Sequence, residues 1–114
     1  MVLACPSCGF LTVEDEIYGT YIICEICGWE DDQVQLANPC SRGGANLVSL
    51  YESQQKAITE IPLEIREHKG IWRSRTWRPL NIQEVQEFTA QTKELQCPNK
   101  GIVYESEAYW NQNS

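Results

Sequence analysis

Residues 5–9 read Cys-Pro-Ser-Cys-Gly and residues 24–28 read Cys-Glu-Ile-Cys-Gly, and these two motifs decide the fold of the chain. Each motif is a Cys-x-x-Cys pair followed by glycine, and fifteen residues separate the pairs. Two such pairs at this separation are typical of a four-cysteine zinc site, because the cysteines of one Cys-x-x-Cys turn wrap an ion readily but form a disulfide only under strain. The predicted ligands of one Zn²⁺ are Cys5, Cys8, Cys24 and Cys27.

The expected zinc site is structural. Four cysteine thiolates complete a tetrahedral coordination shell and leave no open position for water. Such a site contributes directly to folding, with about 10 kcal/mol of binding free energy in small zinc domains. Two alternatives use the same residues: an iron centre, which the sequence does not distinguish from zinc, and a pair of redox motifs. The redox alternative is less favoured, because such a motif usually precedes a helix in a βαβ unit.

The segment between the two cysteine pairs predicts a β-hairpin. Residues 10–13 (Phe-Leu-Thr-Val) and 21–23 (Tyr-Ile-Ile) are strand formers, and the acidic residues 14–16 belong to a polar turn between them. A glycine after each pair permits a positive φ, so that backbone N–H groups can point at the sulfurs. Two cysteine knuckles joined by a hairpin are the plan of a zinc ribbon, which we expect over residues 1–46.

Helices are expected after an irregular stretch over residues 33–46. Ser49 with Glu52 and Asn81 with Glu84 each match the capping box that begins a helix. Mostly apolar residues then recur at helical spacing: Leu50, Gln54, Ala57, Ile58 and Ile61 after the first box, and Ile82, Val85, Phe88, Thr92 and Leu95 after the second.

The expected fold class is α+β in a single domain of 114 residues, since chains usually divide only at greater lengths. A zinc ribbon (1–46) is followed by a mainly helical part (47–114) with two or three helices. Residues 62–69 are expected to add a short helical turn. The tail from residue 102 to 110 could form a strand or lie against the core.

The formal charge of -7 is unevenly distributed along the chain. Residues 1–60 contain nine acidic and two basic side chains, whereas residues 61–114 contain seven of each. The first half therefore carries the whole imbalance, and a zinc–thiolate cluster would add two further negative charges. With 42% hydrophobic residues, the composition suits a globular protein and excludes a disordered tail, a collagen or a membrane span.

An acidic surface for a basic protein partner is expected on the ribbon. A surface of this sign repels phosphate, so nucleic-acid binding by the ribbon is disfavoured. A cationic toxin such as a nuclease is one partner of suitable charge, which would make the protein an immunity protein. The alternative is that the acids are solvated turns and the tryptophan belongs to the core. The candidate partner-binding residues are Glu14, Asp15, Glu16, Trp29, Glu30, Asp31 and Asp32.

A basic and aromatic strip over residues 66–78 supports a second interpretation. Interleaved cations and aromatics are what a nucleic-acid surface needs. In the alternative arrangement, Arg73, Arg75 and Arg78 fold back on the acidic ribbon and the tryptophans enter the core, which the opposite charges favour. The residues of this strip are Arg66, Lys69, Trp72, Arg73, Arg75, Trp77 and Arg78.

The two remaining cysteines, Cys40 and Cys97, are expected to be small, inert, buried residues, although a mutual bridge or a single nucleophile stays open. His68 is the only histidine, and no catalytic triad or metal-protease motif occurs in the sequence, so we expect a protein that is not an enzyme. Nothing after Met1 resembles an export signal, so we expect a cytoplasmic protein with reduced thiols.

The sequence resembles the bacterial cysteine-rich CPCC family of small zinc-ribbon-like proteins over roughly residues 5–55. The resemblance implies metal binding and a compact fold. Ser7 is a departure, because the family name implies a third cysteine at that position, so position 7 is not an essential ligand. The residues that carry the resemblance are 5–9 and 24–32 (the second pair followed by Trp-Glu-Asp-Asp), 34–35, 43–46 (Gly-Gly-Ala-Asn) and 49–50, with a weaker match at 78–80.

Overall fold

The computed structural model describes residues 1–112, and its first two strands flank the first cysteine pair. β1 (Leu3–Ala4) pairs antiparallel with β2 (Leu11–Val13), with Leu3 opposite Val13. The predicted hairpin over residues 10–23 is therefore wrong. Ile23 instead forms a bridge to Glu30, across the second cysteine pair. Each Cys-x-x-Cys-Gly turn folds its own flanks together through two backbone hydrogen bonds, from Cys5 to Phe10 and Gly9 to Cys5 in the first and from Cys24 to Trp29 and Gly28 to Cys24 in the second.

A short helix lies where an irregular stretch was expected. α1 (Gln33–Ala37) begins at Asp32, whose carboxylate accepts hydrogen bonds from the backbone N–H groups of Val34 at 2.8 Å and Gln35 at 3.1 Å. Aspartate is among the best residues for this position, because its oxygen satisfies N–H groups that lack a helical partner. Asp32 is thus the residue in the sequence that indicates this helix, although it was predicted to belong to an acidic surface.

The two longer helices begin at the predicted capping boxes. α2 (Leu50–Glu60) is capped by Ser49 and α3 (Ile82–Glu94) by Asn81, each with the reciprocal glutamate bond. α2 packs one face into the core and buries Leu50 completely. α3 fully buries no residue of its own, and its terminal apolar residues are exposed, Ile82 at 70%. The predicted stripe on α3 is therefore only half-buried.

The expected helical turn at residues 62–69 is replaced by a second hairpin. β3 (Glu67–His68) pairs antiparallel with β4 (Ile71–Trp72). The two residues between them, Lys69 and Gly70, have φ values of 54° and 80°. Two consecutive positive φ angles define the tight turn that matches strand twist, and lysine is an unusual residue at its first position.

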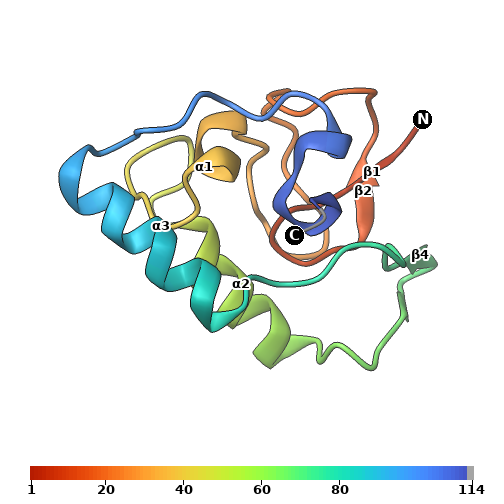
Figure 1. Ribbon diagram of the computed structural model, residues 1–114. Helices are drawn as coiled ribbons and strands as arrows, with labels where there is room; N and C mark the ends of the chain where they lie inside the picture. Colours follow the sequence, from red (N-terminus) through yellow and green to blue (C-terminus); the bar gives the residue numbers. More distant parts are fainter. Residues whose placement is uncertain (113–114) are drawn as a thin grey trace.

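Aromatic side chains from both halves of the chain form the core around the first knuckle. Figure 1 shows the C-terminal turns, η1 (Glu105–Glu107) and η2 (Tyr109–Asn111), lying near β1 and β2. Tyr18 packs edge-on against Trp110, with ring centroids 6.3 Å apart, so the C-terminal segment lies against the core. The buried aromatics are Phe10, Tyr18, Trp29, Trp77 and Trp110.

The secondary structure mixes helices with two small antiparallel hairpins, in agreement with the α+β prediction. None of the helices in the described part of the chain has the length and apolar character that crossing a bilayer requires.

Candidate metal centre

The two cysteine knuckles have the same backbone geometry. In the first, the N–H of Cys5 donates to the carbonyl of Phe10 and the N–H of Gly9 donates to the carbonyl of Cys5, both at 2.8 Å. The second repeats both bonds at the same length, from Cys24 to Trp29 and from Gly28 to Cys24. The glycines have φ values of 81° and 83°, as predicted. Their N–H groups donate to carbonyl oxygens and not, as expected, to the sulfurs.

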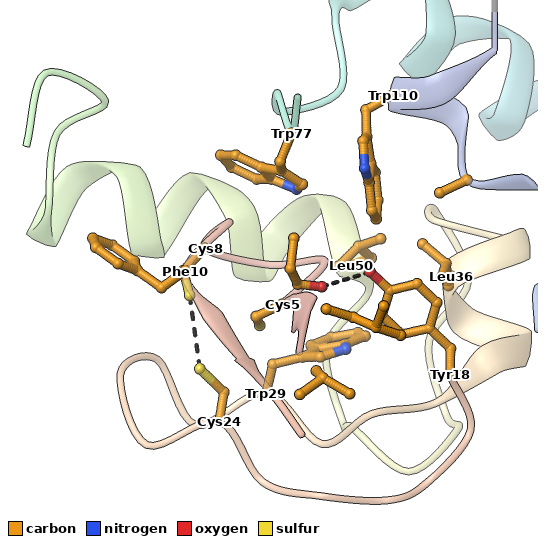
Figure 2. Close-up of a cluster of buried hydrophobic side chains, with 14 of the residues drawn as sticks. Cys5, Cys8, Phe10, Tyr18, Cys24, Trp29, Leu36, Leu50, Trp77 and Trp110 are labelled. Carbon is orange, nitrogen blue, oxygen red and sulfur yellow. Dashed lines mark hydrogen bonds between the residues drawn. The ribbon is translucent and has the colours of Figure 1, made fainter. Parts of the chain in front are cut away.

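These turns bring all four predicted ligands together. The Sγ atoms of Cys5, Cys8, Cys24 and Cys27 all lie within 4.8 Å of one another. Cys5 and Cys27 are 3.6 Å apart, and Cys8 and Cys24, joined by a dashed line in Figure 2, are 3.7 Å apart. Zinc–sulfur bonds of about 2.3 Å in a tetrahedron place sulfurs about 3.8 Å apart. The four sulfurs therefore fit a single tetrahedral metal ion.

The electrostatics of the cluster also favour a cation. Burial raises the pKa of the Cys5 thiol, whereas hydrogen bonding, first from Cys27, lowers the pKa of Cys24. Thr12 adds to this effect, since its hydroxyl donates to the Cys24 sulfur at 3.1 Å. Four sulfurs this close cannot all be anionic without a positive charge between them, and a divalent ion supplies that charge.

The two knuckles differ in exposure. The first is buried throughout, including Pro6 and Ser7, whereas in the second Cys27 is half-buried and Gly28 is exposed. The hydroxyl of Ser7 lies 2.5 Å from that of Ser53 on α2.

Residues 73–77, which we call the clamp segment, cover the first knuckle. Arg73 Nε donates to the carbonyl of Cys8 at 2.8 Å, and the backbone N–H of Ser74 donates to that of Gly9 at 2.7 Å. Trp77 Nε1 donates to the Pro6 carbonyl at 3.1 Å. Burial lowers the pKa of the Arg73 guanidinium. This contact with the first knuckle was not predicted, although Arg73 and Trp77, which make it, both belong to the predicted basic and aromatic strip.

The basic strip is divided by the fold, and neither interpretation describes it fully. Trp77 is buried, as the core alternative expected, whereas Trp72, which it also placed in the core, is exposed. Arg73 is buried too, but it donates to backbone carbonyls and not to acidic side chains. Arg78 pairs with Glu84 on α3 at 2.7 Å. The four other members, Arg66, Lys69, Trp72 and Arg75, are exposed.

The predicted acidic surface is likewise divided. Asp31, Asp32 and Trp29 are buried, with exposures of 1%, 7% and 2%, so their assignment to a partner surface is wrong. Asp31 accepts three hydrogen bonds from the turn at residues 19–20, which explains why a carboxylate is buried there. Glu14, Asp15 and Glu16 are exposed and Glu30 is half-buried.

The remaining cysteines are not bridged. All six thiols are free, and Cys40 and Cys97 contact different groups. Cys40 is half-buried and accepts from the Thr89 hydroxyl at 3.4 Å, whereas Cys97 lies 3.6 Å from the Ser41 hydroxyl. Cys97 is exposed, so its predicted burial is wrong. The ring of His68 packs against Phe10, with centroids 6.2 Å apart.

The sequence was compared with models of protein families and with curated proteins. A family model described as "Cysteine-rich CPCC" matches residues 3–62, which is more than half of the chain and includes all four clustered cysteines. No curated protein matches the sequence.

Proposed function

The chain belongs to the cysteine-rich CPCC family, and we propose that it is a structural zinc protein, not an enzyme, that acts by binding another protein. The observation that carries the metal assignment is the set of four Sγ atoms within 4.8 Å. Cysteine thiolates select zinc or iron, and a closed tetrahedral set is typical of structural zinc. When bound, the ion would cross-link the two knuckles, and its filled coordination shell would leave no open position for a substrate.

Metal analysis of the purified protein tests this assignment. We expect about one zinc per chain, because four thiolates complete one coordination shell. Removal of the metal with a chelator should unfold the protein or sharply lower its midpoint of thermal unfolding, and zinc should restore it. Iron as the bound metal would correct the identity of the ion. A metal-free protein of unchanged stability would contradict the structural role.

The partner-binding role is supported by the charge that stays exposed. Residues 14–16 form an acidic loop on the surface, and Glu25 is also exposed. None of these acids belongs to the two ion pairs found among residues 1–112, Arg42–Glu52 and Arg78–Glu84. Uncompensated surface charge of one sign steers association with a partner of the opposite sign. The proposed partner is a basic protein. In the most specific form of this proposal, the partner is a cationic toxin and the chain is the immunity protein that neutralises it.

The partner role can be tested by affinity capture from the native cell at low salt. The wild-type protein should retain a basic protein that the charge-reversed variant Glu14→Lys/Glu16→Lys does not retain. The matched control is Glu87→Lys/Glu94→Lys, which makes the same charge change on α3 and should retain the partner. Capture of no basic protein, or equal capture by both variants, would contradict the role of the acidic loop.

A second candidate function rests on the exposed half of the basic strip. Trp72 is 62% exposed and borders a cavity of about 480 Å³ that Arg75 also lines. An exposed aromatic next to cations can stack a base and bind its phosphate. Oligothymidylate should then quench the tryptophan fluorescence of the wild-type protein at low salt. The quenching should be weaker at high salt and absent in the Trp72→Ala variant. Absence of quenching at low salt would exclude this candidate.

A further inference from the structure

Arg73 is a buried cation next to the metal centre. Its side chain is embedded in the core with an exposed fraction of only 3%, and its guanidinium carbon lies 4.5 Å from the centroid of the Phe10 ring. All its nitrogens donate to backbone carbonyl oxygens at 2.8–3.1 Å, those of Cys8, Ile61, Pro62 and Ile65.

No carboxylate of residues 1–112 forms an ion pair with this guanidinium, although Glu64 attracts it from a greater distance. The two ion pairs among residues 1–112 involve other arginines, Arg42 and Arg78. A buried charge is costly unless it is paired, and carbonyl dipoles offset only part of that cost. Arg73 is therefore the one arginine that is both fully buried and without an acidic partner in the described chain. Its burial needs a negative charge from another source.

The cysteine cluster next to Arg73 is such a source of negative charge. One divalent ion with four thiolates has a net charge of about -2. The Arg73 Nε atom is 2.8 Å from the Cys8 carbonyl oxygen. Covalent geometry limits that oxygen to within about 5 Å of the sulfur of the same residue. The guanidinium and the cluster thus lie within roughly 8 Å, in surroundings of low dielectric constant where charges interact strongly.

We propose that Arg73 is the buried counter-charge of the metal–thiolate cluster, an inference that rests on the proposed structural metal. Arg73 stabilises the anionic metal-bound cluster, and the cluster stabilises the buried arginine. This coupling is reciprocal, as any thermodynamic linkage must be. Metal binding therefore holds the clamp segment against the first knuckle, and loss of the metal removes the charge that keeps Arg73 in the core.

Zinc affinity, measured by competition with a chromophoric chelator, tests the proposal. Arg73→Met removes the charge while keeping an unbranched side chain, and zinc affinity should fall about 10- to 100-fold, as for other outer-sphere partners of metal ligands. Arg73→Lys keeps the charge but loses the planar fork that reaches four carbonyl groups, so its loss of zinc affinity should be smaller than that of Arg73→Met and stay below about tenfold. The control is Arg78→Met, which removes a cation paired with Glu84 and should leave zinc affinity unchanged.

A second measurement separates a charge effect from a packing effect. In a Cys27→His background the cluster carries one fewer negative charge, so the loss caused by Arg73→Met should become smaller. A purely structural Arg73 would give the same loss in both backgrounds, and that result would overturn the proposal. If Arg73→Met does not fold, Arg73→Lys decides: a tenfold or greater loss of zinc affinity despite the retained charge would also overturn it. Absence of zinc binding by the wild-type protein would instead refute the structural metal itself.

Discussion

The indole nitrogen of Trp77 donates a hydrogen bond of 3.1 Å to the carbonyl oxygen of Pro6, a residue 71 positions earlier in the sequence. Pro6 lies inside the first Cys-x-x-Cys turn, so the contact joins the metal centre to a segment beyond the residues that define the family. The same carbonyl also accepts from Gln54 on α2 at 2.9 Å. The Pro6 carbonyl of the first knuckle is therefore held by one side chain from α2 and one from the clamp segment.

Truncation of Trp77 should be strongly destabilising. Trp77→Ala should lower the free energy of unfolding by about 3–5 kcal/mol, because a large buried side chain leaves a cavity. Trp77→Phe keeps most of the ring and loses one hydrogen bond, for a cost of about 1–2 kcal/mol. Urea unfolding of the zinc-loaded protein measures both. Trp72→Ala is the control: this exposed tryptophan should change stability by about 0.5 kcal/mol or less, and equal effects at the two positions would contradict the clamp.

The two knuckle glycines should respond differently to alanine. Both have positive φ, which costs a side-chain-bearing residue about 1–2 kcal/mol. A Cβ at Gly28 meets nothing within 4 Å, whereas a Cβ at Gly9 would lie 2.2 Å from the ring of Trp77. Gly9→Ala should therefore cost a further 1–3 kcal/mol or so by overpacking. Chemical denaturation of both variants gives the difference, and equal losses would show that the Trp77 ring moves away freely.

Loss of one ligand should abolish stable folding. Cys24→Ser removes a thiolate from a site worth about 10 kcal/mol, which is comparable to the whole stability of a small domain. Circular dichroism and metal analysis should report an unfolded, zinc-free protein. Cys97→Ser is the matched control, because this exposed thiol is outside the cluster. It should retain zinc and native stability, and a folded Cys24→Ser protein with full zinc would exclude the proposed ligand set.

Replacing Ser7 with the cysteine implied by the family name should not change the metal stoichiometry. The Ser7 hydroxyl contacts Ser53, and four other cysteines already complete one coordination shell, so Ser7→Cys should still bind about one zinc per chain. Stability should fall by about 1 kcal/mol, because the hydrogen bond to Ser53 is weakened. Zinc titration monitored by a chelator measures the stoichiometry. Two zinc ions per chain would show that position 7 can act as a ligand.

Local patterns in the sequence were sufficient to predict that four cysteines gather at one site and where the two longer helices, α2 and α3, begin. The four cysteines form two short motifs whose chemistry permits few arrangements, and the capping boxes at Ser49 and Asn81 depend on residues three positions apart. The strand pairing was not predictable in the same way, because residues 21–23 and residues 3–4 are both apolar and both could pair with residues 11–13. The two connecting loops, residues 5–10 and 14–20, differ by one residue, so chain entropy does not distinguish them. The observed pairing is the one that continues the backbone hydrogen bonds of the first knuckle, from Cys5 to Phe10 and from Gly9 to Cys5.

The burial of charged residues could not be predicted from composition. Asp31 and Asp32 follow Glu30 as an acidic run, yet both are buried because nearby backbone N–H groups converge on their carboxylates. Arg73 and Trp77 show the same limit. An alternation of arginine and tryptophan suits a nucleic-acid surface and a buried clamp equally well. What decides for the buried clamp is the pair of carbonyl oxygens of the first knuckle that accept from these side chains, and they come close only in the folded chain.

The separation of the clamp segment from the cysteines has a consequence for the order of events during translation. Cys27 is the last ligand to be synthesised, and Trp77 follows 50 residues later (77 − 27). At about 5–20 residues per second, this separation corresponds to roughly 3–10 s. During that interval all four cysteines have been synthesised, whereas the clamp segment that covers the first knuckle has not. The ribosome thus provides a period in which a metal donor can reach a cluster that the finished protein encloses on one side.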